Sequence, residues 1–356
     1  MKRRISIFFG LSLIWTSGAH AAGGGDPFAF LQLPVDARPT ALGGAYTAIG
    51  GDSASIFYNP AGLAFAERNT ASFMHNSHFE GVNQEVASIA FKNGLGLGIN
   101  YLSFGDIPRT TVSNQAGSGF DSFSANDLAI TSGYGRRMNA FLSAGFAIKF
   151  VREKIANFTG SGFGLDLGTQ IELEPLYEIP LTVGVAIQNI GLSSLKFQSQ
   201  REAFPTQFRL GFAYKKTIGT HRLTGLLDIN RAGDDNATLH PGVEWVPRTG
   251  VALRIGYDGR NDAGSGITTG VGFAMGDMYL RYAFVPFGDL GDSHRVSLGV
   301  AWGAPNRMPD RTARRKRVKE KRRRRPAPRW HPGRPKRLPP EIERPAYFES
   351  NKNIGG

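Results

Sequence analysis

The sequence predicts an all-β fold: a transmembrane antiparallel β-barrel of about 14 strands with an N-terminal plug and a disordered basic C-terminal tail. Three observations predict it: an export signal, an even number of segments in which apolar and polar residues alternate, and a block of arginines and prolines after the last segment. On this basis the chain divides into residues 1–21, 22–66, 67–303 and 304–356, which are the signal peptide, the plug, the barrel and the tail.

The first 21 residues have the pattern of a secretory signal peptide. Three basic residues at positions 2–4 precede an apolar run over 5–15, and Ala-His-Ala at 19–21 is a small-x-small cleavage site. The apolar run is shorter than the ~20 residues that a spanning helix needs. We therefore expect an exported mature chain that begins at Ala22.

The body of the chain is built from segments with the period of a strand. Val296, Leu298 and Val300 alternate with Arg295 and Ser297, so one face is apolar and the other is polar. Fourteen such segments follow one another, an even number, as bacterial single-chain barrels require. Their strands are expected to begin near residues 69, 85, 94, 124, 140, 163, 181, 208, 221, 239, 251, 268, 278 and 294.

Alternation alone fits two kinds of protein. In a soluble β-sandwich the apolar face is the core, whereas in an outer-membrane barrel it faces lipid and the polar face lines the lumen. The export signal and the even strand number favour the barrel. The segments recur about every 17 residues, which accommodates a membrane strand of ~10 residues and a short loop. We therefore expect a location in the outer membrane of a Gram-negative-type bacterium.

The net charge of +13 is confined to the tail. Residues 304–356 contain 18 Lys and Arg against 5 Asp and Glu, while residues 1–303 contain 24 of each. A basic tail on a neutral body argues against nucleic acid as a partner, and the tail composition predicts disorder. In the periplasm its available partners are anionic lipid and peptidoglycan. The alternative is that the tail is an out-of-frame extension.

No pattern in the chain predicts an enzyme. The absence of cysteine removes thiol nucleophiles and Cys-ligated metal sites, and no Ser-His-Asp or paired-carboxylate pattern stands out. His75 and His78, the closest histidine pair, are three residues apart, which places them on opposite faces of a strand. We expect no catalytic residue, no metal and no other cofactor.

A glycine-rich segment ahead of the strands carries a family resemblance. Residues 41–52 are mostly small and lead into the block Asn59, Pro60, Ala61, Gly62 and Leu63. In its spacing A-x-x-x-D-x-x-x-x-x-x-N-P-A-G-L, placed before fourteen alternating segments, the chain resembles the PorV/PorQ family of FadL-like outer-membrane barrels. The resemblance covers most of residues 27–303 and implies that residues 22 to about 66 fold into the barrel as a plug. The alternative is that Asn59-Pro60 is an ordinary turn.

The resemblance implies two functions. The first is a non-enzymatic envelope component that shuttles or attaches secreted cargo proteins, as in type IX secretion. The second is a FadL-like channel for long-chain fatty acids or other hydrophobic small molecules. A structural, porin-like scaffold is a third alternative, and outer-membrane lipid is an expected partner in every case.

Strand three is where a lateral gate would lie. In FadL-like transporters this strand is kinked to open such a gate, which the resemblance places at Gly94, Gly96 and Gly98 in this chain. Glycine weakens a strand and permits bulges, so the assignment is physically reasonable. The alternative is that these glycines make room for the plug.

Charged residues recur on the polar faces of the strands. As a salt-bridge network they would hold the plug and satisfy buried charge, which is the reading we favour. As guanidinium forks they would instead bind the carboxylate or another anion of a permeating amphiphile. The candidate lumen charges are Asp166, Arg209, Asp228, Arg254, Arg281 and Arg295.

Truncation after Gly303 tests the tail. Residues 22–303 hold 21 basic and 24 acidic residues, so the truncated mature chain has a net charge of −3 and should still fold. In vesicle and peptidoglycan sedimentation assays, only the full chain should bind, and raised salt should release it because the Debye length falls to ~3 Å at 1 M. Equal, salt-insensitive binding by both forms would remove any role of the tail in binding.

Overall fold

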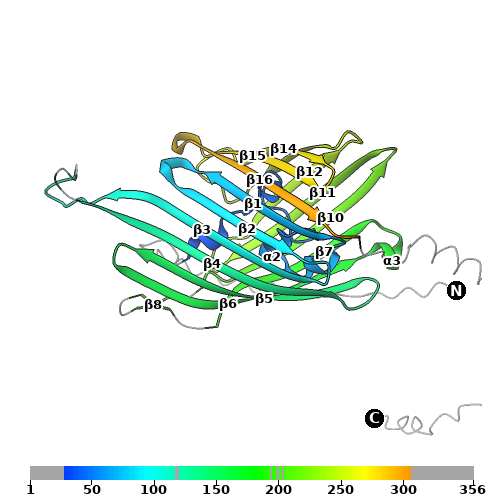
Figure 1. The fold of residues 1–356 in the computed structure, drawn as a ribbon, viewed down its shortest axis with the longest axis horizontal. Coiled ribbons are helices and arrows are strands. Elements are labelled where there is room, and N and C mark those ends of the chain that lie inside the picture. The colour runs from blue at the N-terminus through cyan, green and yellow to red at the C-terminus, as the bar shows by residue number, and fades with distance from the viewer. Residues whose placement is uncertain are drawn as a thin grey trace, which may run out of the picture. The chain divides into compact units, whose positions relative to one another are not determined.

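Fourteen strands close into a barrel within the residues that the computed structural model describes, which are 28–305 apart from 116, 118, 120, 193–194, 198–199 and 203. All neighbouring strands are antiparallel, and β1 pairs with β16 to close the sheet (Figure 1). A closed barrel leaves no unpaired edge, which a strand in lipid requires. The predictions on the signal peptide and the tail concern residues outside the described ones, apart from 304 and 305 at the start of the tail.

Every predicted strand start lies within five residues of an observed one, and the largest difference is at β6. The barrel strands are β1 (Asn69–Ser77), β2 (Asn83–Ala90), β3 (Leu95–Pro108), β4 (Ser122–Arg137), β5 (Leu142–Ile155), β6 (Phe158–Glu172), β7 (Leu181–Gly191), β10 (Gln207–Ile218), β11 (His221–Ala232), β12 (Thr238–Val246), β13 (Val251–Tyr257), β14 (Ile267–Met275), β15 (Met278–Pro286) and β16 (Asp292–Trp302).

A small second sheet interrupts the succession of barrel strands. β8 (Leu195–Phe197) and β9 (Gln200–Glu202) pair with each other between β7 and β10. The sequence analysis missed this hairpin because three residues are too few to show an alternating pattern.

The outer surface of the barrel is apolar, and this decides between the two kinds of protein that alternation allowed. Val296, Leu298 and Val300 are exposed on the outside of β16, whereas Arg295 and Ser297 are buried inside. The same facing holds around the barrel, where most of the large exposed apolar side chains belong to strands. A closed barrel with an apolar exterior and a polar interior is a transmembrane barrel, not a soluble sandwich.

The two ends of the barrel differ in their connections. We call the end where β1 begins and β16 ends the terminal end, and the opposite end the distal end. Three long connections lie at the distal end, over 109–121, 192–206 and 258–266. Most turns at the terminal end span four residues or fewer, and a longer one carries α3 (Glu174–Tyr177). Short turns at one end and longer loops at the other are typical of outer-membrane barrels.

The segment that precedes β1 lies inside the barrel and is made of short helical turns. These are η1 (Ala29–Gln32), α1 (Ala37–Thr40), α2 (Ser55–Tyr58) and η2 (Pro60–Phe65), while η3 (Phe79–Gly81) and η4 (Gly288–Leu290) are turns between strands at the distal end. Leu42, Tyr46, Ile56 and Leu63 of this segment are fully buried. Among the described residues, no helix has the length and apolar character needed to span a membrane.

The lipid-facing register of β16 can be tested by one substitution. Leu298 is 52% exposed at mid-strand on the outside, so Leu298→Arg should destabilise the barrel by ~2–4 kcal/mol if it lies near the bilayer midplane. The measurement is equilibrium unfolding in bilayers. Leu290→Arg is the matched control, because Leu290 is similarly exposed in a distal turn instead of a strand. Equal loss of stability in both variants would show that Leu298 does not face lipid.

Candidate functional site

A buried carboxylate on the inner wall, Asp228, binds the N-terminal segment. Asp228 of β11 is fully buried, and its Oδ2 accepts hydrogen bonds from the backbone amides of Tyr46 and Thr47 at 3.1 and 3.0 Å and from the Thr47 hydroxyl at 2.6 Å. Arg209 of β10 donates to the same oxygen at 3.1 Å and to the carbonyl of Gly44 at 2.7 Å. A buried charge is tolerated only with such pairing.

A second ionic cluster joins the segment to β12 and β13. Arg38 donates through Nε and Nη2 to the two carboxylate oxygens of Glu244, both at 2.8 Å, in the bidentate geometry that guanidinium favours. Arg254 donates to Glu244 from the other side at 2.7 Å. Arg38 also donates to the hydroxyl of Tyr46 at 2.9 Å, and that hydroxyl donates to Asp52 at 2.6 Å.

The segment is also tied to β15 and β16. Arg281 pairs with Asp36 at 3.2 Å, and Asp36 additionally accepts from the hydroxyl of Ser72 at 2.9 Å. Arg295 is buried and donates to the hydroxyl of Thr40 at 2.8 Å, and no carboxylate of the described residues lies within ion-pair distance of it. Arg295 is therefore held in the interior by a hydrogen bond to the segment and not by a direct ion pair.

The remaining predicted charge, Asp166, pairs with a residue that sequence reasoning missed. Lys149 of β5 lies 3.0 Å from Asp166, which also accepts the backbone amide of Asn189 at 2.7 Å. Here the β6–β7 register shifts between Leu165 and Leu167, so Asp166 sits in an irregularity of the wall. Period-two alternation with the inward-facing Ala147 was the signal that could have placed Lys149 inside.

The structure places all six predicted lumen charges on the inner wall but does not gather them into one site. They are divided among the clusters described above, and their partners Arg38, Glu244 and Lys149 were not singled out from the sequence. Arg38 and the carboxylates Asp36 and Asp52 belong to the N-terminal segment, where no strand pattern marks a side chain as facing the wall.

The block Asn59, Pro60, Ala61 and Gly62 lies against β4, β5 and β6. Asn59 is fully buried, and its Nδ2 donates to the carbonyls of Thr47 at 2.9 Å and Thr169 at 3.0 Å, while its Oδ1 accepts from Ala61 at 3.1 Å. A Cβ at Gly168 would lie 2.0 Å from that Oδ1, so only glycine allows this approach. The block therefore connects the segment to the wall and is more than a local turn.

The glycines of strand three lie against the N-terminal segment. Gly94 precedes β3 in a tight turn with φ of +92°, while a Cβ at Gly96 or Gly98 would meet Leu63 at 2.9 Å or the Phe57 ring at 2.4 Å. The pairing of β3 with β2 and β4 is continuous along Gly96 and Gly98. The only register shift between β3 and β4 in the described residues is between Ser103 and Asp106, so a gate at the three glycines stays a prediction.

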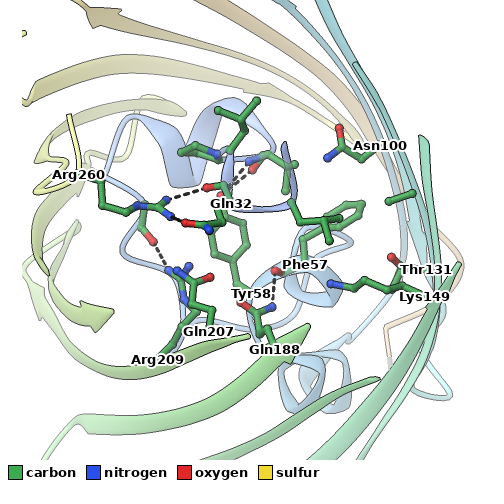
Figure 2. Close-up of a pocket in the computed structure, with 16 residues that line it drawn as sticks. Gln32, Phe57, Tyr58, Asn100, Thr131, Lys149, Gln188, Gln207, Arg209 and Arg260 are labelled. Carbon is green, nitrogen blue, oxygen red and sulfur yellow. Dashed lines mark hydrogen bonds between the residues drawn. The ribbon is translucent and has the colours of Figure 1, made fainter. Parts of the chain in front are cut away.

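A cavity lies between the N-terminal segment and the wall (Figure 2). Its own volume is about 30 Å³, room for a few water molecules, and the empty space reaches about 520 Å³ only when the solvent at its mouth is included. One side is formed by the mostly apolar residues 31–35, of which Gln32 is polar, and by Phe57 and Tyr58. Polar side chains of β3, β4, β5, β7 and β10 complete it, and the lining residues drawn and labelled include Asn100, Thr131, Lys149, Gln188, Gln207, Arg209 and Arg260.

Arg260, in the distal loop after β13, fastens the segment over this cavity. It donates to the carbonyl of Gln32 at 2.7 Å and to its side-chain oxygen at 3.3 Å. Its neighbour Asp258 stays ionised: burial alone would raise the Asp258 pKa, but the hydrogen bond from His240 and the Arg260 guanidinium outweigh burial and hold that pKa below its usual value.

Among the described residues, no three His, Asp or Glu side chains lie close enough together to bind a metal ion. His75 is exposed on the outside of β1, 2.6 Å from Glu85. His78 lies after β1 in a distal turn, with its ring tilted against that of Phe79 and edge-on to that of Phe287.

The chain resembles known proteins only in its fold. No family model and no curated protein matches the chain. Among solved structures it is similar to the Pseudomonas putida toluene transporter TodX (12% identity, 74% of this chain and 95% of that chain, TM-score 0.46). It is also similar to the CymD monoaromatic hydrocarbon channel (11%, 76% and 97%, 0.49) and to the KdgM porin (8%, 66% and 99%, 0.34). Sequence identities of 8–12% and TM-scores below 0.5 do not transfer a function, so the function must follow from the chain's own residues.

The Asp228 anchor generates a stability prediction. Asp228→Asn removes the charge that compensates Arg209 while keeping the size of the side chain, and breaking a buried pair in this way should cost about 3–5 kcal/mol. Chemical unfolding in detergent measures the loss, and limited proteolysis should show earlier cleavage within residues 28–66. Asp277→Asn, which breaks the exposed pair with Arg68, is the control and should leave both readouts unchanged. If the two variants showed the same stability and the same proteolysis, Asp228 would not hold the N-terminal segment.

Proposed function

We propose that this chain is an outer-membrane channel that takes up a hydrophobic small molecule and holds it in the lumen cavity on its way inward. The observation that carries the proposal is the cavity itself, which has an apolar side made by the N-terminal segment and a polar side made by the wall. Small-molecule sites combine apolar side chains with placed polar groups that orient the ligand, and both kinds line this cavity. The apolar barrel exterior supports insertion in the membrane.

The orientation of the barrel suits uptake. In outer-membrane barrels the short turns face the periplasm and the longer loops face the outside. The distal end is then the outer end, and the cavity lies near it, because Gln207 begins β10 at that end and Arg260 belongs to a distal loop. A molecule from outside therefore meets the cavity, which the Asp228 cluster borders through Arg209, before it meets the ionic cluster of Glu244.

The ionic clusters argue against a wide, water-filled pore. Expelling the N-terminal segment would break the pair of Arg38 with Glu244 and the pairs of Asp36 and Asp52 with Arg281. Each broken buried pair costs several kcal/mol. We therefore propose passage beside the segment, along the wall of β3 to β5, where most of the contacts with the segment are packing.

A second candidate function is the shuttling or attachment of secreted proteins, as in type IX secretion of the PorV/PorQ kind. The contacts of Asn59, Pro60 and Ala61 with the wall favour it, because these residues carry the resemblance. Gentle purification in detergent followed by mass spectrometry of proteins and extracted lipids separates the candidates. A stoichiometric hydrophobic molecule supports the channel, and stoichiometric cargo proteins support the second function.

Filling the cavity tests the channel directly. Ala129 of β4 is buried and lines the cavity, so Ala129→Leu should reduce the retained hydrophobic molecule and its uptake into proteoliposomes at least tenfold. Ile130→Leu is the matched control, because the adjacent side chain faces lipid. Folding is verified by the shift in gel mobility between unboiled and boiled samples. Unchanged uptake by a folded Ala129→Leu barrel would refute passage through this cavity.

A further inference from the structure

The seam between β1 and β16 differs from every other contact in the barrel wall. Elsewhere, neighbouring barrel strands follow each other along the chain, whereas β1 and β16 are the first and the last strand. They pair over their whole common length, from Asn69 opposite Trp302 to Ser77 opposite His294. Contacts between residues far apart in the chain form slowly, because closing a long loop loses entropy before the contact is gained. The seam is therefore the wall contact whose formation costs the most chain entropy.

Residues 36–40 of the N-terminal segment lie across the inner side of this seam. On the β1 side, the hydroxyl of Ser72 donates to the carboxylate of Asp36 at 2.9 Å. On the β16 side, the backbone amide of Ala37 donates to the hydroxyl of Ser297 at 2.9 Å. This short stretch therefore forms hydrogen bonds with the first and the last strand at once.

The carboxylate of Asp36 also reaches β15, on the far side of β16. Arg281 of β15 pairs with it at 3.2 Å, and the backbone amide of Arg38 donates to it at 2.9 Å from within the segment. Asp36 is 3% exposed, and a buried carboxylate is stable only when such partners are in place. Because its partners come from β1 and β15, the burial of Asp36 is favourable only when both strands stand beside β16.

The backbone of this stretch is held firmly against the wall. Asp36 has a φ of +67°, which is rare for a residue other than glycine and persists only where the surroundings determine it. Ala37 and Ala41 pack against Ala283 of β15, and their small side chains let α1 approach the wall closely. A second hydrogen bond to β16 comes from Arg295, which donates to the hydroxyl of Thr40 at 2.8 Å.

We infer that residues 36–40 act as an internal template for closure of the barrel. The stretch precedes β1 in the chain and binds its inner side through Ser72. Its remaining hydrogen-bonding groups then bind Arg281 of β15 and Ser297 of β16, which brings the last two strands to β1 in register. This role in assembly is independent of the channel function.

Refolding of the full chain into detergent tests the template. Asp36→Ala loses the contacts with β1 and β15, so closure should be about tenfold slower, as expected for contacts that form in the transition state. The difference in gel mobility between unboiled and boiled samples follows closure with time. Glu85→Ala is the control, because it removes a carboxylate that contacts His75 of β1 on the outside of the barrel, and it should refold at the wild-type rate.

A disulfide across the seam separates templating from plain stabilisation. The chain has no cysteine, so Ala71→Cys with Val300→Cys adds one possible disulfide, between residues that face each other across β1 and β16. Opposed residues of antiparallel strands lie within the Cα distance that a disulfide spans. Formed before refolding, this disulfide holds the two strands together. It should bring Asp36→Ala to within about twofold of the rate of the disulfide-linked wild type, because the long loop is then already closed.

Phe212→Cys with Leu227→Cys is the matched control disulfide, because these residues also face each other but join the consecutive strands β10 and β11. It should leave Asp36→Ala slow. Refolding of Asp36→Ala at the wild-type rate would overturn the inference, and so would equal rescue, or no rescue, by the two disulfides. If Asp36→Ala does not close at all, closure restored by the seam disulfide alone supports the template, and failure to close with it overturns the template.

Discussion

The arrangement inside this barrel depends on the charge of Asp228. Its carboxylate fixes Thr47 through two hydrogen bonds, and the carbonyl of Thr47 in turn accepts from Asn59 and from Gln170 of β6. Asn59 then reaches the wall through the carbonyl of Thr169. A line of contacts therefore runs from β11 through the N-terminal segment to β6. It exists because each buried polar group in a barrel interior needs a partner, and the segment supplies them.

The same side-chain chemistry serves two purposes at different places in the lumen. Arg254 and Arg281 are paired with carboxylates and act as anchors, whereas Arg209 is anchored through part of its guanidinium and borders the cavity with the rest. Arg254 and Arg281 are thus part of a salt-bridge network, while anion binding by the lumen arginines stays a prediction. Whether a lumen arginine is fully paired depends on which carboxylates lie near its strand.

The sequence predicted correctly which side chains face inward, because side chains alternate between the two faces of a strand. A side chain on a strand must point in or out, so Arg295 and Leu298 could be assigned to opposite faces from spacing alone. Arg260 escaped notice because it lies in a loop, and Gln207 because an uncharged amide at a strand start carries no signal. Arg38 and Glu244 were missed since their pairing joins residues about two hundred positions apart.

Alternation and an even number of segments predicted the barrel and its lipid-facing side, because both follow from local backbone geometry and from the solvent on each face. Which residues meet inside the lumen was decided only by closure of the sheet and by the path of the segment before β1. That path brings Tyr46 and Thr47 to Asp228 and leaves Gln207 facing a cavity. Contacts between distant parts of a chain depend on its three-dimensional course, and no local pattern encodes that course.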